Sequence, residues 1–229
     1  MKKKTVDVKI DKEFIRKLHE RLFSWWKYNH KSYPWRWEKD PYRILIAELF
    51  LHRTQTPQAE KVYRDFISRF PDIHSLSDAD KNEIRTILTP LGLNWRISKI
   101  INILNILRNL KKIPDKYEEL ESLPGVGNYI ASATLVFAYN RPLPLLDTNT
   151  VRVAGRLLGM KITDSSRRSK NFRQAIQAIM DKENPRDFFY ALIDLGQQVC
   201  KARNPDCCSC PLQNICKYSI SRKKERQED

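Results

Sequence analysis

Apolar residues at helical spacing run through most of this 229-residue sequence, and this pattern restricts the chain to an all-α fold. Between residues 14 and 26, large apolar side chains recur at three- and four-residue steps, which is the signature of an amphipathic helix. A second long stripe runs from Ile97 to Leu110 and stops before Pro114. The sequence therefore predicts helices over both segments.

Local start signals add further helices to this pattern. Asp40-Pro41 combines an N-cap residue with a first-turn proline, and Thr56-Pro57 repeats that signal. Two more helices are expected from about residue 171 to 180 and from about residue 186 to 199. Only residues 6–10 alternate like a strand, and that segment is short and terminal.

The charge of the chain favours a polyanionic partner. Forty-two Lys and Arg residues against 27 Asp and Glu give a formal net charge of +15, which points to nucleic acid or, less often, to anionic lipid. No apolar run approaches the roughly 18–20 residues that span a bilayer, and no apolar segment follows the basic N-terminus as in a secretory signal. We expect no membrane partner and a cytoplasmic, nucleoid-associated location.

All five cysteines lie between residues 200 and 216, and four of them follow the pattern Cys-x6-Cys-x2-Cys-x5-Cys. Clustered thiolates in an intracellular protein indicate a metal site, and sulfur donors select zinc or iron–sulfur clusters. The pattern lacks the paired knuckles of a zinc ribbon, so it favours a 4Fe–4S cluster over zinc or unligated thiols. The predicted ligands are Cys200, Cys207, Cys210 and Cys216, and Cys208 is interpreted as a spare thiol.

The segment Leu123-Pro124-Gly125-Val126-Gly127 separates two expected helices. Two glycines at this spacing allow a tight turn and the close approach of another backbone. The second helix begins directly after the turn, so its first N–H groups can bind a DNA phosphate. An ordinary turn between helices is the alternative interpretation.

Two carboxylates are candidates for chemistry. Asp147 follows an apolar stretch and precedes a helix, so it is either an N-cap or a catalytic acid. Glu48 lies on an apolar helical segment, where a carboxylate belongs either to the polar edge of the helix or to a site.

Together the segment 123–127, Asp147 and the cysteine spacing resemble the helix-hairpin-helix DNA glycosylases of the endonuclease III superfamily, over about residues 30 to 217. The resemblance implies a six-helix barrel domain over 32–141 that contains the hairpin. It also implies an iron–sulfur cluster domain built from 1–31 and 142–229, with the DNA-binding cleft between the two domains. Shorter matching fragments are Tyr33-Pro34-Trp35-Arg36, Ala47-Glu48-Leu49, Arg53-Thr54-Gln55, Leu91-Gly92-Leu93 and Asp194-Leu195-Gly196.

The resemblance also implies a reaction. The family flips a base out of the duplex and breaks its N-glycosidic bond, and a carboxylate stabilises the cationic sugar. That carboxylate is Asp147, which alternatively activates water or stabilises a transient adduct. Glu48 is placed in the base pocket, where it either hydrogen-bonds a flipped pyrimidine or helps to protonate the leaving base.

Position 129 separates members of the family. Those that also cut the DNA backbone carry a lysine there, which forms a Schiff base, and adenine-removing members typically carry serine. This chain has Tyr129, and a phenol cannot form a Schiff base. The chain is therefore similar to the archaeal-type mismatch-specific thymine glycosylases, and we predict a monofunctional enzyme that removes thymine or uracil opposite guanine. A packing role for this aromatic residue is the alternative.

The same resemblance assigns the DNA contacts. The turn Leu51-His52-Arg53 fills the space left by the flipped base, although a solvated face is the alternative for the two basic residues. Asn94 or Trp95 is a second wedge candidate. The hairpin residues Leu123, Gly125, Val126 and Gly127 hold the backbone of a duplex that carries a mispaired or deaminated base, with a monovalent cation at the hairpin when DNA is bound. The protein is expected to be a monomer.

Three competing functions stay open. An adenine glycosylase acting opposite 8-oxoguanine or guanine shares both carboxylates, but it has serine at position 129 and usually carries an added C-terminal domain, whereas here only residues 217–229 follow the cysteines. Removal of thymine opposite 8-oxoguanine is a variant target. A non-catalytic DNA-binding scaffold is disfavoured because Glu48, Tyr129 and Asp147 occur together.

Overall fold

The computed structural model describes residues 10–92 and 94–225, and every regular element within those ranges is a helix. The expectation of an all-α fold is therefore confirmed. Residues 6–9 of the expected strand lie outside the described residues. In the described part of the chain, each helix is too short or too polar to cross a bilayer.

The chain forms two compact units. One consists of Ser32–Arg141 and is called the central unit; the other joins Met1–Lys31 to Pro142–Asp229 and is called the terminal unit.

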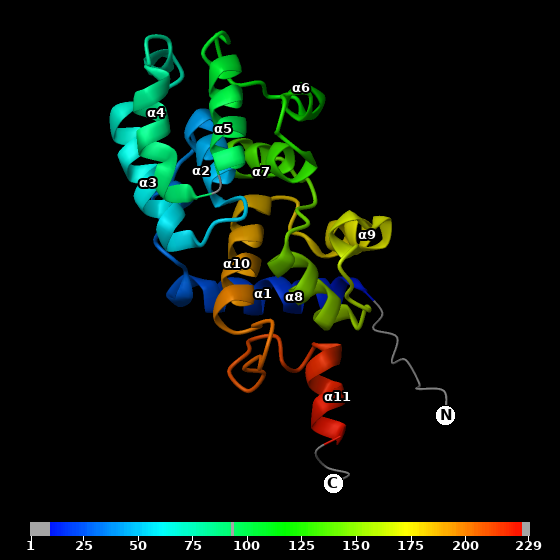
Figure 1. Ribbon diagram of the computed structural model, residues 1–229. Coiled ribbons are helices and arrows are strands. Elements are labelled where there is room, and N and C mark those ends of the chain that lie inside the picture. The colour runs from blue at the N-terminus through cyan, green and yellow to red at the C-terminus, as the bar shows by residue number, and fades with distance from the viewer. Residues whose placement is uncertain (1–9, 93, 226–229) are drawn as a thin grey trace. The chain divides into compact units, whose positions relative to one another are not determined.

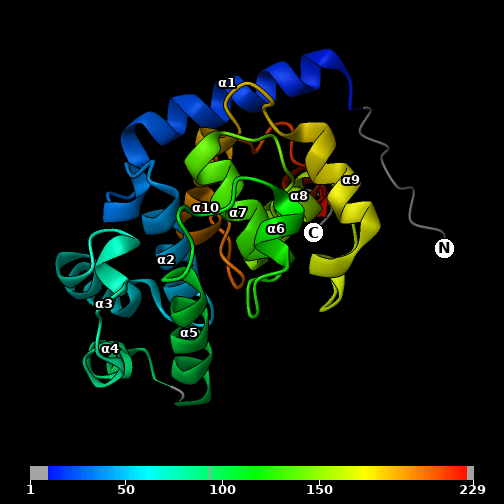
Figure 2. The same cartoon turned by 90° about the horizontal axis from the view of Figure 1, so that it is seen from above.

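The central unit is organised around α2, whose residues from Ile44 to Phe50 are all buried. This helix packs against α7 and α3, and α4 packs against both α3 and α5 (Figure 2). A helix that is apolar on every face belongs inside a unit rather than on its surface. The helices of this unit are α2 (Pro41–Leu51), α3 (Thr56–Arg69), α4 (Lys81–Leu88), α5 (Asn94–Leu107), α6 (Tyr117–Glu121) and α7 (Asn128–Tyr139).

Local caps explain where these helices begin. The Asp40 side chain accepts hydrogen bonds from the main-chain N–H groups of Tyr42 and Arg43, at 2.8 and 3.1 Å, which satisfies two free donors at the start of α2. Helix α3 begins at Thr56, with Gln55 as its N-cap and a proline in its first turn. The start signal at Asp40-Pro41 is therefore confirmed, whereas at Thr56-Pro57 the first-turn proline is confirmed but the N-cap is Gln55 rather than Thr56.

The terminal unit is organised around α8, which packs against α9, α10 and α11, while α1 packs along α10 (Figure 1). The indole N–H of Trp26 in α1 donates to the Asp194 carboxylate in α10 at 2.9 Å, so a polar contact fixes this apolar interface. The helices of this unit are α1 (Lys12–Asn29), α8 (Thr148–Leu158), α9 (Lys170–Ile179), α10 (Pro185–Gln198) and α11 (Lys217–Glu225).

The predicted long helices are confirmed as α1, α5, α9 and α10, with ends within a few residues of those expected. Two helices were not anticipated. Helix α4 is short, and its only buried residues are Ile84 and Leu88, one turn apart. The segment after the last cysteine forms α11 as far as Glu225, and the sequence patterns above predicted no helix there.

Candidate functional site

The hairpin between α6 and α7 is a tight turn built on Gly125. The N–H of Val126 donates to the carbonyl of Leu123 at 2.9 Å, and Gly125 has a φ of +89°, which L side chains rarely adopt. A Cβ at this glycine would lie 2.9 Å from Cδ1 of Ile103. Val126 is buried and anchors the turn. The positive φ therefore favours glycine here, and any larger residue would also have to displace the end of the Ile103 side chain.

Gly127 has a different role from Gly125. It is the N-cap of α7 and has an ordinary φ of −81°, and a Cβ there would meet nothing within 4 Å. The missing side chain leaves space for another group beside the first N–H groups of α7. Such N–H groups, together with the helix dipole, form an anion site. The turn therefore has the geometry that a phosphate contact requires.

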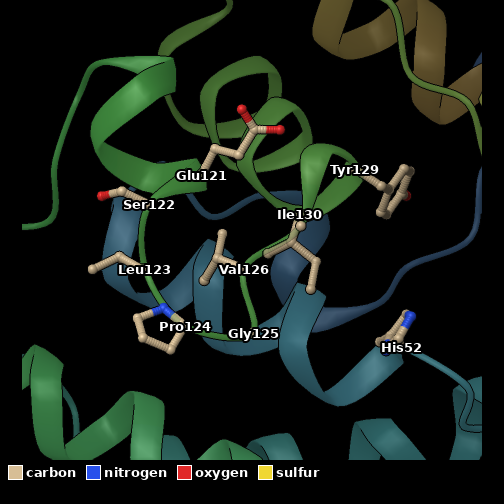
Figure 3. A pocket seen from close by; sticks show the side chains of 10 residues that line it. His52, Glu121, Ser122, Leu123, Pro124, Gly125, Val126, Tyr129 and Ile130 are labelled. Atoms are coloured by element: carbon tan, nitrogen blue, oxygen red, sulfur yellow. The ribbon is translucent and has the colours of Figure 1, made fainter.

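A hollow of about 450 Å³ lies beside the hairpin. Residues 121–127 form one wall, Tyr129 and Ile130 of α7 continue it, and His52 at the end of α2 closes another side. Figure 3 shows the Tyr129 and His52 side chains at the same side of the hollow. The structure thus brings together the hairpin, Tyr129 and His52, which the sequence singled out separately.

Glu48 is buried in α2, with 5% of its surface exposed. It lies one turn before His52, whose main-chain N–H donates to its carbonyl at 3.2 Å. Of the two alternatives that the sequence left open, the exposed polar edge of a helix is therefore excluded. A buried carboxylate costs free energy unless polar partners compensate it, so its presence in an apolar helix favours a functional position.

The turn after α2 presents two basic side chains to solvent, His52 and Arg53. Arg53 has a φ of +63°, a strained conformation for a residue with a Cβ. Its guanidinium carbon lies 5.9 Å from the centre of the Trp95 ring at the start of α5, next to Asn94. The two wedge candidates that the sequence proposed, after α2 and at the start of α5, are therefore neighbours. Leu51 is half-buried at the end of α2.

In the terminal unit, Asp147 is the N-cap of α8. One carboxylate oxygen accepts from the Thr150 N–H at 2.6 Å, and the Thr150 hydroxyl accepts from the Asp147 N–H at 2.9 Å, which completes a capping box. The other oxygen accepts from the Asn149 side-chain amide at 2.9 Å. The N-cap interpretation is therefore correct, and the half-buried carboxylate is held in one orientation by a main-chain N–H and a side-chain amide of its own helix.

Behind Asp147, a chain of hydrogen bonds leads to the cysteine segment. The Asn149 side-chain oxygen accepts from Arg152 at 2.8 Å, and Arg152 also donates to the carbonyls of Gly196 and Cys200, each at 2.8 Å. Burial lowers the pKa of Arg152 from its usual value. A Cβ at Gly196 would lie 2.9 Å from that of Asn149, so the glycine permits this close packing of α10 on α8.

The cysteines lie between α10 and α11. Arg156 of α8 donates to the Cys200 sulfur at 3.3 Å, and the Cys216 thiol donates to the Arg156 carbonyl at 3.4 Å. Burial, together with the neighbouring thiols of Cys200, Cys216 and Cys207, raises the pKa of Cys210 to about 12. Cys208, by contrast, is exposed. Within the described residues, no group of three or more His, Cys, Asp or Glu side chains is arranged to hold a metal ion.

Comparison with known proteins decides the family. A model of the HhH-GPD superfamily of base excision DNA repair proteins matches residues 46–178, which is more than half of the chain and contains the hairpin, Glu48 and Asp147. The chain belongs to this superfamily.

Its relatives extend the match to nearly the whole chain. A thymine-DNA glycosylase of Aeropyrum pernix is 35% identical over 218 residues, which cover 91% of this chain and 97% of that protein. A thymine/uracil-DNA glycosylase of Pyrobaculum aerophilum is 34% identical, covering 91% and 94%. An adenine DNA glycosylase of Buchnera aphidicola is 32% identical over 90% of this chain but over only 59% of that protein. The protein is therefore a DNA glycosylase of base excision repair.

Solved structures show the same fold. A thermostable thymine-DNA glycosylase superposes with a TM-score of 0.83 at 25% identity, over 91% of this chain and 98% of that one. A DNA complex of endonuclease III superposes with a TM-score of 0.76, over 93% and 99%. The resemblance that the sequence motifs indicated is confirmed.

Three residues that the structure makes prominent had no predicted role: Asn149, Arg152 and Arg96. The first two stand two and five positions after Asp147, where a capping aspartate often has polar neighbours, so local spacing gave a partial signal. Arg96 interrupts the apolar stripe of α5 at a buried position. A single arginine on an apolar helix face was the only sign of it in the sequence.

Proposed function

We propose that this protein removes thymine or uracil mispaired with guanine, by hydrolysis of the N-glycosidic bond and without cutting the DNA strand. The observation that carries the proposal is Tyr129, which lines the hollow beside the hairpin; the family resemblance implies that strand-cutting members have lysine at this position. Relatives named as thymine and thymine/uracil glycosylases, matched over more than nine-tenths of their length, support the same base choice.

In the proposed reaction, the Asp147 carboxylate stabilises the positive charge that develops on the sugar as the base leaves. Two donors from its own helix, the Thr150 N–H and the Asn149 amide, already orient it. A preorganised carboxylate needs little rearrangement as charge develops, which is the property that electrostatic catalysis requires. A water molecule then adds to the sugar and completes hydrolysis.

Glu48 and Tyr129 are assigned to the base. Glu48 hydrogen-bonds the flipped pyrimidine or delivers a proton to it as it leaves. The Tyr129 phenol packs beside the base and sugar and supplies no amine, so a Schiff base does not form. The two residues belong to α2 and α7, which pack directly on one another.

The DNA contacts are assigned to three segments. The hairpin residues Leu123, Gly125, Val126 and Gly127 present main-chain N–H groups to a phosphate, with a monovalent cation at the hairpin when DNA is bound. Leu51, His52 and Arg53 fill the space left by the flipped base and contact the unpaired guanine. Asn94 is assigned to the same contact, because it precedes Trp95, over whose ring the Arg53 guanidinium lies. The substrate is double-stranded DNA with a mispaired or deaminated base, bound by a monomer.

We also propose a 4Fe–4S cluster held by Cys200, Cys207, Cys210 and Cys216 in the domain formed by 1–31 and 142–229. The donor set fits, because these four sulfurs lie close enough to influence one another electrostatically, whereas Cys208 is exposed. Such a cluster places its own iron and sulfide atoms between the ligands, so the cysteines need not converge on one ion. When bound, it would brace the segment between α10 and α11.

The substrate panel that tests this proposal consists of duplexes containing G·T, G·U, A·8-oxoguanine and T·8-oxoguanine pairs. Purified protein is incubated with each, and abasic sites are counted with and without alkali. We expect excision from G·T and G·U, with strand breaks only after alkali. Excision of adenine would instead support an adenine glycosylase. Tight binding without excision on all four duplexes would identify a DNA-binding scaffold.

A further inference from the structure

Arg96 is a buried arginine in the first turn of α5, with 3% of its surface exposed. One guanidinium nitrogen donates to the carbonyls of Leu49 and Phe50, at 3.1 and 2.7 Å. The other donates to the Thr54 hydroxyl and to the carbonyl of Leu91, the latter at 3.5 Å. One side chain therefore joins the end of α2, the turn that follows it and the segment before α5.

The hydrogen bonds at the end of α2 show why this contact matters. A helix leaves its last four carbonyls without partners inside the helix. Here the Glu48 carbonyl accepts from the His52 N–H at 3.2 Å, and that of Leu51 accepts from the Thr54 N–H at 3.3 Å. The two carbonyls between them accept from Arg96. Arg96 therefore completes the C-terminal cap of α2, and its charge offsets the negative end of the helix dipole.

The two turns that Arg96 joins present a charged aromatic surface to solvent. Trp95 is 48% exposed, and the guanidinium of Arg53 lies over its ring at 5.9 Å. The ammonium of Lys99 lies 5.1 Å from the same ring. An aromatic ring stacks on any base, and an arginine recognises the acceptor atoms of guanine, so this pair has the chemistry of a contact with an unpaired purine.

We infer that Arg96 is a positioning residue that holds the turn after α2 and the start of α5 as one rigid wedge, with Arg53 and Trp95 at its exposed tip, and that this wedge keeps the duplex open while a base is extrahelical. The inference rests on the proposed function. All four acceptors of Arg96 are neutral oxygens, and burial lowers the pKa of its guanidinium from the usual value. A wedge built before binding avoids the cost of ordering two separate turns on DNA.

The test compares two uracil substrates in single-turnover excision. One duplex carries a G·U pair, and the other places uracil opposite an abasic analogue, where no pair has to be broken. Arg96→Lys keeps a positive charge but cannot reach both turns at once. We expect it to slow excision from G·U by at least about tenfold and to leave the second substrate within about twofold, because only the first requires opening of a base pair.

A spectroscopic readout separates positioning from general damage. With 2-aminopurine next to the G·U pair, wild-type binding should raise its fluorescence by unstacking it, and Arg96→Lys should reduce that rise. Arg108→Lys is the matched control, because Arg108 is a part-buried arginine that also donates to a carbonyl, that of Ala79, at 3.1 Å. The control should behave as wild type in both assays.

Equal slowing of both substrates by Arg96→Lys, or an unchanged fluorescence rise, would overturn the inference. If this variant fails to fold, Thr54→Val and Trp95→Ala disturb the same wedge and leave Arg96 in place, and each should show the same selective loss on G·U. Wild-type protein that excises no base from any duplex would refute the proposed function instead. The two failures are therefore distinguishable.

Discussion

The capping box at α8 makes it possible to separate the structural and the proposed catalytic roles of Asp147. In Asp147→Asn, the amide oxygen can still accept from the Thr150 N–H, so the cap is retained, because Asn and Asp are about equally good N-caps. The new amide nitrogen would face the side-chain amide of Asn149, which in the wild-type protein donates to the Asp147 carboxylate at 2.9 Å. One hydrogen bond is lost, which costs about 0.5–1.5 kcal/mol of folding free energy.

The expected effect on catalysis is much larger. Asparagine is neutral and cannot stabilise a cationic sugar, so excision should slow by at least about a hundredfold, the scale seen when one preorganised electrostatic contact is removed. The melting temperature should fall by only a few degrees, since roughly 1 kcal/mol corresponds to about 2–4 °C in a chain of this size. Binding to a G·U duplex should change little, because Asp147 contributes no positive charge to the DNA contacts.

The measurements are single-turnover excision on a G·U duplex, DNA affinity by gel shift, and thermal unfolding. Asp11→Asn is the matched control, because Asp11 caps α1 through the same third-residue contact, to the Phe14 N–H at 2.9 Å. It should excise at the wild-type rate. If Asp147→Asn also kept the wild-type rate while losing stability, Asp147 would be an N-cap and nothing more, and the proposed mechanism would be refuted.

Four further predictions follow from the site. Tyr129→Lys should give a borohydride-trappable adduct and strand cleavage, and its absence after incubation with G·U would contradict the account of position 129. Gly125→Ala should lower the unfolding free energy by about 1–2 kcal/mol, because its φ is positive. Gly127→Ala should leave the stability unchanged and weaken DNA binding. Equal melting temperatures for the two variants would contradict this contrast. Cys210→Ser should lose iron and brown colour, while Cys208→Ser should keep both. Equal iron content in the two purified variants would contradict the proposed set of cluster ligands. Finally, DNA affinity should fall steeply with salt, by a log–log slope of about −0.9 per phosphate contact, and a flat profile would argue against a phosphate-binding surface.

Helix positions could be predicted where the signal is local. The Asp40-Pro41 pair places the start of α2 because capping and the fixed φ of proline act within one turn. The short helices α4 and α11 were missed, since a helix of eight or nine residues has only about two turns over which an apolar stripe can repeat. Tertiary packing rather than intrinsic preference determines such segments.

In the candidate site, too, local contacts could be predicted from the sequence and distant contacts could not. The N-cap role of Asp147 could be predicted, because its capping partner Thr150 is only three residues away, and the structure shows that the cap is present. The same local pattern could not decide whether Asp147 is also a catalytic acid. Arg96 could not be assigned, because the two acceptors that it shares with the end of α2 are main-chain carbonyls 46 and 47 residues earlier, and every residue type carries a carbonyl. Sequence patterns reveal side-chain chemistry, but not which main-chain groups a fold leaves unsatisfied.

The most direct test of the central proposal is chromatography of the product released from a G·T duplex whose mispaired thymine is radiolabelled. The account predicts free labelled thymine in equal amount to abasic strands that stay intact until alkali is added. Label that remains in the strand after binding has been demonstrated, or strands that break without alkali, would contradict it.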